Sequence, residues 1–326
     1  MRRLVLILLL TACASRDVTP KQQGLSYAAA SPRLGTYGTD SSLESLRNAR
    51  ELGVNWISVT PFGFQRGAPP IRMGGYETDD SVKATIAQAH SLDIKVLLKP
   101  HVWMRDGATI DDDDYERFIL HFAALARDAH ADALCIGNEL RRSAKDDARW
   151  RVLIANVRNV YKGPLTYGAN FDEVLDVPFW DALDWIGVSG YFPLVDAKTP
   201  DRASLIKAWQ PIAQKLEALS TKYKRPVLFT EIGYRSVEGA AWRQWEIPRD
   251  APLNLDAQRN AYEAFFETMW PRTWVIGAYP WKWFSYPNHG SITSNDYDLE
   301  HKPAADVIRR AYTSHSTSAS SSSMRR

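Results

Sequence analysis

Residues 133–140 read ALCIGNEL, a short apolar run that ends in the polar pair Asn138 and Glu139. Residues 227–234 read VLFTEIGY, in which Glu231 follows a second apolar run. Short apolar runs that end abruptly in polar residues are typical of strands buried on both faces of a parallel sheet. Both stretches are therefore predicted to be strands that carry a glutamate at their carboxyl ends.

Six further apolar runs accompany these two in the 326-residue chain. The eight runs lie near residues 25–29, 54–60, 94–99, 133–137, 164–168, 184–189, 226–230 and 275–280. Segments with apolar residues three and four positions apart separate most of them, which predicts intervening helices. The first and fifth units are weak, and only residues 179–182 offer a short helix in the fifth. Eight such units favour a single-domain α/β protein with a (β/α)8 TIM barrel, although an open doubly wound sheet has the same pattern.

The N-terminus has the order of an export signal. Arg2 and Arg3 precede an apolar run over residues 4–10, which is too short to span a bilayer, and small residues follow it. Residues 10–13, LTAC, resemble the lipobox of bacterial lipoproteins, which implies lipidation of Cys13. The alternative is an ordinary signal peptide cut near Ala14. The predicted segments are a lipoprotein signal peptide at 1–12, a tether at 13–23, the barrel at 24–313 and a disordered Ser-rich tail at 314–326.

Lipidation would place the protein on the bacterial cell envelope. Acyl chains on Cys13 would anchor it stably to a membrane. Ala14 follows the cysteine, and the absence of Asp there resembles lipoproteins passed on to the outer membrane, where a cell has one. Cys135 is then the only other cysteine, so no intramolecular disulfide can form, and its apolar surroundings predict a buried, inert thiol.

Charge and motifs argue against several classes of function. Without residues 1–12, the 40 Lys and Arg become 38 and equal the 38 Asp and Glu, so no nucleic-acid partner is expected. The acidic run 111–114 precedes a predicted helix and should stabilise its N-terminus rather than bind metal. Neither a zinc-binding H-E-x-x-H nor a G-x-S-x-G serine-hydrolase motif occurs. The sequence predicts a monomer that needs no cofactor.

The strand positions of Glu139 and Glu231 predict that the two side chains share one site. An active site in a TIM barrel lies at the carboxyl ends of the strands, and the fourth and seventh strands face each other. Glu139 and Glu231 are therefore predicted to converge, although either alone could be a merely solvated or ion-paired residue. Two converging carboxyls can cleave a glycosidic bond, one as a proton donor and one as an ionised partner. A carboxyl separation of about 5 to 5.5 Å would give retention, and a wider gap inversion.

Four sequence motifs of the chain resemble those of known proteins. Asn138-Glu139 after the fourth strand and Glu231 after the seventh look like the clan A retaining glycoside hydrolases. Residues 24–312 further resemble glycoside hydrolase family 113, through KPHVW at 99–103, GNEL at 137–140, FTEIGY at 229–234 and WKWF at 281–284. The resemblance implies Glu139 as acid/base, Glu231 as nucleophile, and endo-acting hydrolysis of β-1,4-mannan.

The clan resemblance also assigns two polar neighbours of the glutamates. It implies that Asn138 bonds the 2-hydroxyl of the reacting sugar, whereas a plain alternative is a side chain that caps the turn after the strand. It implies that Tyr191, within SGYFP at 189–193, bonds the nucleophile and keeps it ionised. A buried tyrosine bonded to a carbonyl is the alternative there.

Aromatic residues at strand ends are predicted to bind sugar. Trp281 and Trp283 alternate on one face beyond the eighth strand, where an indole can cover the CH face of a sugar, and Trp281 is favoured as the platform. His101 and Trp103 follow the third strand and are predicted to line the same cleft, although a lone histidine is often structural.

The expected partner is a polysaccharide or oligosaccharide substrate. A glucan or other hexosan hydrolase, or a transglycosylase, would differ in loops such as Phe62–Gly75. A lipoprotein that binds polysaccharide without cutting it, on an inherited barrel with its aromatic platforms, is the alternative from another class.

Overall fold

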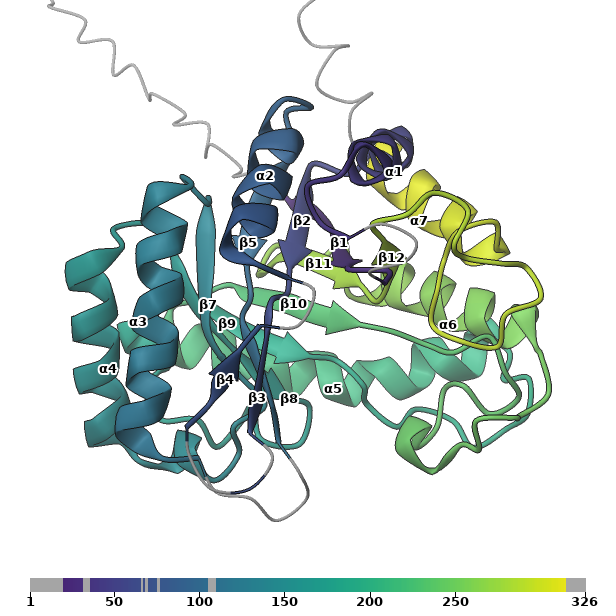
Figure 1. Ribbon diagram of the computed structural model, residues 1–326. Helices are drawn as coiled ribbons and strands as arrows, with labels where there is room; N and C mark the ends of the chain where they lie inside the picture. The colour runs from purple at the N-terminus through teal and green to yellow at the C-terminus, as the bar shows by residue number, and fades with distance from the viewer. Residues whose placement is uncertain are drawn as a thin grey trace, which may run out of the picture.

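A computed structural model describes residues 20–31, 36–65, 67, 70–74, 77–104 and 110–314. Eight parallel strands form a closed barrel (Figure 1), because the last strand pairs back with the first, Gln22 opposite Gly277. The strands are β1 (Gln22–Ala28), β2 (Trp56–Val59), β5 (Lys95–Leu98), β7 (Ala133–Asn138), β8 (Leu165–Asn170), β9 (Trp185–Ser189), β10 (Val227–Ile232) and β11 (Val275–Pro280). The predicted TIM barrel is confirmed, and closure excludes the open sheet.

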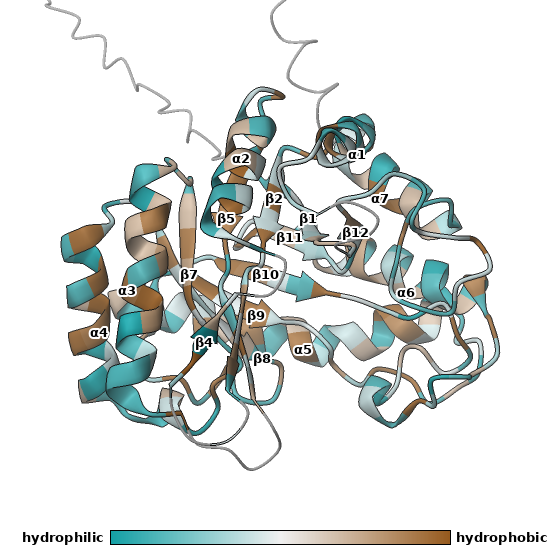
Figure 2. Cartoon of the chain, in the orientation of Figure 1, coloured by the Kyte–Doolittle hydropathy of each residue, from teal (hydrophilic) through white to brown (hydrophobic). Residues whose placement is uncertain are grey.

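Seven α-helices surround the barrel in the described part of the chain. They are α1 (Asp40–Glu51), α2 (Asp79–His90), α3 (Asp112–Asp128), α4 (Asp147–Val160), α5 (Arg202–Tyr223), α6 (Leu255–Thr268) and α7 (Pro303–Thr313). Between β8 and β9 lies only a short 3-10 turn, η2 (Trp180–Ala182), as the weak fifth unit predicted. Figure 2 shows apolar and polar residues together along α3 and α4, as expected for helices with one buried face.

Side-chain caps fix where the helices begin. At α3, the carboxylate of Asp111 accepts a hydrogen bond from the backbone N–H of Asp114 at 2.9 Å, and acidic residues fill the first turn. The prediction that this acidic run stabilises a helix N-terminus is confirmed.

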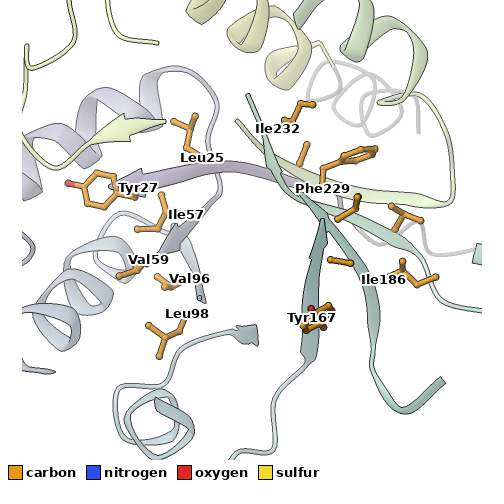
Figure 3. Close-up of a cluster of buried hydrophobic side chains, with 14 of the residues drawn as sticks. Leu25, Tyr27, Ile57, Val59, Val96, Leu98, Tyr167, Ile186, Phe229 and Ile232 are labelled. Atoms are coloured by element: carbon orange, nitrogen blue, oxygen red, sulfur yellow. The ribbon is translucent and has the colours of Figure 1, made fainter. Parts of the chain in front are cut away.

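The core has two shells because successive side chains of a strand point to opposite faces. Val96 and Leu98 of β5 belong to the outer shell between strands and helices, and Figure 3 shows them with their neighbours Ile57 and Val59 of β2. Leu97, between them, belongs to a separate inner cluster together with Cys135. Burial raises the pKa of the Cys135 thiol to about 11, so the predicted inert thiol is confirmed.

A small second sheet, which the sequence analysis missed, extends one side of the barrel mouth. It contains β3 (Phe62–Gln65), β4 (Arg72–Met73) and β6 (His101–Met104) in the order β4-β3-β6. A Cβ at Gly63 would lie 2.6 Å from the ring of Phe118, so this face of the sheet packs tightly on α3. Two further short elements are η1 (Ser143–Lys145) and β12 (Trp283–Phe284), which pairs with β1.

The predicted terminal segments lie mostly beyond the described residues. The signal peptide, Cys13, the tether up to residue 19 and the tail from residue 315 all lie outside them. None of the helices in the described ranges combines the length and apolar character that a bilayer crossing requires.

Candidate active site

Glu139 stands directly after β7 in a conformation that few non-glycine residues adopt. Its backbone φ is +57°, and its N–H donates to the carbonyl of Gly168 at 2.8 Å. The pairing of β7 with β8 is irregular between Cys135 and Asn138, which is a common feature at the rims of barrels next to active sites. A left-handed residue at a strand end is strained, and such strain persists only where the surroundings enforce it.

A buried hydrogen-bond chain supports this turn. The N–H of Leu140 donates to the hydroxyl of Tyr167 at 2.8 Å, and this hydroxyl donates to Oε1 of Glu173 at 3.1 Å. The N–H of Asn170 also donates to Glu173, at 2.9 Å. Glu173 is only 4% exposed, and burial raises its pKa. The backbone on the carboxyl side of Glu139 is thus connected through Tyr167 to Glu173, an acid near the two glutamates of the site.

Glu231 lies near the end of β10, where the register with β9 shifts between Phe229 and Glu231. Its carboxylate is held at both oxygens. The ammonium of Lys99 donates to Oε1, and the hydroxyl of Tyr191 donates to Oε2 at 2.7 Å. Burial disfavours the charged form, but Lys99 and Tyr191 outweigh it and hold the pKa of Glu231 below its ordinary value.

Glu139 has the opposite electrostatic environment. Burial and then repulsion by the negative charge of Glu231 raise the pKa of Glu139 to about 7. The barrel mouth therefore holds one carboxyl that keeps a proton near neutral pH and one that is ionised. Separation of two carboxyl pKa values by their environments is how one site assigns an acid and a base.

His101 and Asn138 form a bonded pair beside the glutamates. The side-chain amide of Asn138 lies 2.9 Å from Nδ1 of His101. Burial and the charge of Lys99 lower the pKa of His101 to about 4, so the ring is neutral at ordinary pH. Because the amide nitrogen donates, Nδ1 accepts and the ring proton sits on Nε2.

The two tryptophans after β11 have different surroundings. Trp281 is partly exposed, and its ring centroid lies 5.5 Å from Nζ of Lys99, which places it beside the Glu231 carboxylate. Trp283 is 5% exposed, and its indole N–H donates to Oγ of Ser45 at 2.9 Å. The prediction that both share one face is wrong, because Trp283 is in register with Tyr27 and, like it, points outward to α1. Trp283 is part of the buried core.

Trp103 lies outside this central group. It is 49% exposed on β6, two residues beyond His101, and its ring faces Phe64 at a centroid distance of 6.5 Å. The structure thus places Trp103 on the small sheet, at the side of the mouth, while Asn138, Tyr191, Trp281 and His101 gather around the glutamates.

Two residues of the central group escaped the sequence analysis. Lys99 is fully buried, although a lysine that follows an apolar run is usually exposed to solvent at the end of its strand. Its position directly after the third strand was the available signal. Tyr297, whose ring lies 6.2 Å from that of Tyr191, comes from a long loop with no periodic pattern. In the described ranges, no group of three or more His, Cys, Asp or Glu residues is arranged to hold a metal ion.

Comparison with known proteins identifies a family and solved structures that this chain resembles. A sequence model of glycoside hydrolase family 113 matches residues 25–110 and 112–302. The family 113 β-mannanase of Alicyclobacillus acidocaldarius, solved in complex with ManMIm, is 28% identical with a TM-score of 0.79, and the match covers 90% of this chain and 98% of that one. A second family 113 β-1,4-mannanase is 27% identical with the same TM-score, covering 90% and 99%.

More distant similarity concerns the fold alone. A β-glucuronidase from Ruminococcus gnavus is 11% identical with a TM-score of 0.63, and the match covers 90% of this chain and 50% of that one. Among proteins with curated descriptions, none matches.

Proposed function

The chain belongs to glycoside hydrolase family 113, and on that premise we propose that it hydrolyses the backbone of β-1,4-mannan with retention of configuration. It is a glycoside hydrolase by family. Two family 113 β-mannanases of known structure share its barrel over 90% of the chain at 27–28% identity, which supports a mannan-type substrate. The opposed pKa shifts of Glu139 and Glu231 are the observation that carries the mechanism.

In the first step Glu231 attacks the anomeric carbon and Glu139 protonates the leaving oxygen. The ionised state of Glu231 supports its role as nucleophile, and the raised pKa of Glu139 supports its role as acid. The bond between the sugar and its leaving group breaks as the bond to Glu231 forms. The product is a glycosyl ester on Glu231 and a released sugar chain.

In the second step the proton moves in the opposite direction, from water to Glu139. Once Glu231 is esterified its charge is gone, so the repulsion that raises the pKa of Glu139 disappears. Glu139, now ionised, removes a proton from the incoming water, which attacks the anomeric carbon and releases Glu231. The same electrostatic coupling thus supports both the acid and the base role of Glu139.

Neighbouring residues orient the reactants. Tyr191 and Lys99 hold the carboxylate of Glu231 and stabilise its charge before attack. Asn138, fixed by His101, directs its amide toward the 2-hydroxyl of the reacting sugar, and Trp281 covers the apolar face of that sugar. No observation on the described residues favours a non-catalytic binding protein, since both carboxyls and their supporting bonds are present.

The cellular setting proposed for this enzyme rests on the N-terminal sequence. The predicted export signal followed by Cys13 supports an enzyme anchored by lipid to the cell envelope, at the outer membrane where one exists. Export would give it access to an extracellular polysaccharide.

A panel of defined manno- and gluco-oligosaccharides, together with mannan, tests the substrate. We expect the wild type to cleave the mannose series and Glu231→Gln to cleave neither. Cleavage of gluco-oligosaccharides alone would remove the mannan assignment in favour of a glucan or hexosan hydrolase. New, longer oligosaccharides as the main products would instead indicate a transglycosylase.

A further inference from the structure

The small sheet β4-β3-β6 presents an aromatic face to the barrel mouth. Phe62 pairs with His101 and Phe64 with Trp103, so that all four side chains lie on one face of the sheet. The opposite face, with Gly63, packs on α3. Where a sheet of a monomeric protein has one face buried, the other is usually polar, so an aromatic outer face indicates a binding surface.

Ring contacts connect this face to the reacting centre. The rings of His101 and Phe62 are 5.5 Å apart, those of Phe62 and Phe64 are 6.2 Å apart, and Trp103 follows at 6.5 Å from Phe64. His101 in turn holds Asn138. We call Phe62, Phe64 and Trp103 the sheet platform. It begins at the catalytic residues and ends at the half-exposed ring of Trp103.

A second aromatic pair, with one exposed ring, lies on another part of the mouth. Trp245, in the 3-10 turn η3 (Gln244–Glu246), is 57% exposed and stacks on Phe171 with centroids 5.5 Å apart and planes 16° apart. Phe171 contacts Phe192, which contacts the buried Trp209, so the pair rests on the core. We call Phe171 and Trp245 the loop platform.

The loop platform is fixed next to Glu231. The side-chain amide of the buried Gln244 donates to the carbonyl of Gly233 at 2.8 Å. Gly233 is two residues after Glu231, and Gln244 directly precedes Trp245. An exposed tryptophan would gain from contact with a partner, and Gln244 fixes the turn that carries Trp245 to the backbone just after Glu231.

Strand order places the two platforms across the mouth from each other. The closed order is β1-β2-β5-β7-β8-β9-β10-β11, so β2 and β5 lie opposite β9 and β10. β3 and β6 of the sheet platform follow β2 and β5. Phe171 follows β8, and the turn with Trp245 follows β10. The glutamates, after β7 and within β10, lie between the two platforms.

We infer that a glycan chain lies across the barrel mouth, with sugars stacked on the sheet platform at one end and on the loop platform at the other. Flat rings match the apolar CH faces of β-linked hexoses, and the Trp N–H groups can reach hydroxyls. This inference deepens the proposed function and rests on it for the identity of the sugar. Two platforms that bind the same chain favour long substrates over short ones.

Binding of mannohexaose, measured by calorimetry in a Glu231→Gln background, tests the inference without turnover. Trp103→Ala and Trp245→Ala should each weaken binding by about 10-fold, the loss typical of a truncated aromatic anchor. Trp103→Phe and Trp245→Phe should restore much of it, which separates loss of the ring from misfolding. Trp274→Ala, at the amino end of β11 and so at the far end of the barrel, is the matched control and should bind normally.

The outcomes separate this inference from the proposed function. Unchanged affinity in both platform variants would overturn the inference, and loss in only one of them would overturn a two-sided cleft in favour of a one-sided one. Hydrolysis by the wild type, assayed in parallel, reports on the function alone. If cellohexaose binds and mannohexaose does not, and both variants weaken the cellohexaose complex about 10-fold, the platforms stand while the mannan assignment fails.

Discussion

The hydroxyl of Tyr191 donates a 2.7 Å hydrogen bond to Oε2 of Glu231, while Lys99 occupies the other oxygen of the same carboxylate. Three strands of the barrel, β5, β9 and β10, deliver these groups to one point. Both groups donate hydrogen bonds to the carboxylate, which favours its ionised form. A protonated carboxyl would need an acceptor for its O–H, and neither group accepts in this arrangement. Glu231 is therefore held in the ionised form that its proposed role as nucleophile requires.

Tyr191→Phe removes one of the two donors and keeps the ring. We expect kcat/KM to fall by about 10- to 100-fold, the range for a lost hydrogen bond to a charged group. Loss of a donor to the charged form raises the pKa of Glu231, so the acidic limb of the kcat/KM profile should move to higher pH. An acidic limb that stays in place would show that Tyr191 does not stabilise the carboxylate.

Lys99→Met leaves Glu231 buried without its cation. Breaking a buried ion pair in this way typically costs about 3 to 5 kcal/mol in the free energy of unfolding. In the wild type, the depressed pKa of Glu231 contributes stability that is present above its unfolded pKa and lost as pH falls through its folded pKa.

The Lys99→Met deficit should therefore be largest near pH 7 and shrink toward pH 4, where Glu231 of the variant takes up a proton. Thermal melts of both proteins across that range measure it. Lys95→Met, at the exposed start of the same strand, is the control and should show little change at any pH. A deficit that grows as pH falls would contradict the ion-pair account.

Glu173→Gln tests whether the third buried acid influences Glu139. Its negative charge raises the pKa of Glu139 after the larger effects of burial and Glu231. Gln keeps an oxygen that can accept from Tyr167, so the turn should survive. The basic limb of the kcat/KM profile, which reports loss of the Glu139 proton, should shift to lower pH. A shift to higher pH would mean that the substitution acts through geometry and not through charge.

Glu139→Gln removes the proposed proton donor. We expect turnover of mannan to fall by about 10²- to 10⁴-fold, the usual contribution of general acid catalysis. A dinitrophenyl β-glycoside, whose leaving group needs no proton, should form the glycosyl-enzyme nearly as fast as with the wild type. Equal losses on both substrates would remove Glu139 from the acid role.

The barrel and the positions of the two glutamates were predictable because both depend on local pattern. Apolar runs such as ALCIGNEL identify a strand without knowledge of its neighbours, and the geometry of a closed barrel then places the strand ends. Asp111 was likewise predictable as a cap, since capping involves residues only three positions apart.

The missed features depend on distant contacts. Lys99 acquires its importance from Glu231, 132 residues away, and alone it resembles a solvated strand end. Trp283 was assigned to the wrong face because its direction is set by contacts far along the chain, with Tyr27 of β1 and Ser45 of α1. The small sheet was missed because its strands, FGFQ, RM and HVWM, mix polar residues and glycine with apolar ones, whereas β2 and β5, with four residues each, lie in apolar runs.

Trapping of the glycosyl-enzyme tests the central claim most directly. A 2-deoxy-2-fluoro-β-mannobiosyl fluoride should esterify the nucleophile and slow its release, and peptide mapping by mass spectrometry then locates the label. The account predicts one mannobiosyl group on Glu231 and none on the Glu231→Gln variant. A label on another residue, or mannan hydrolysis by a Glu231→Gln variant at the wild-type rate, would contradict it.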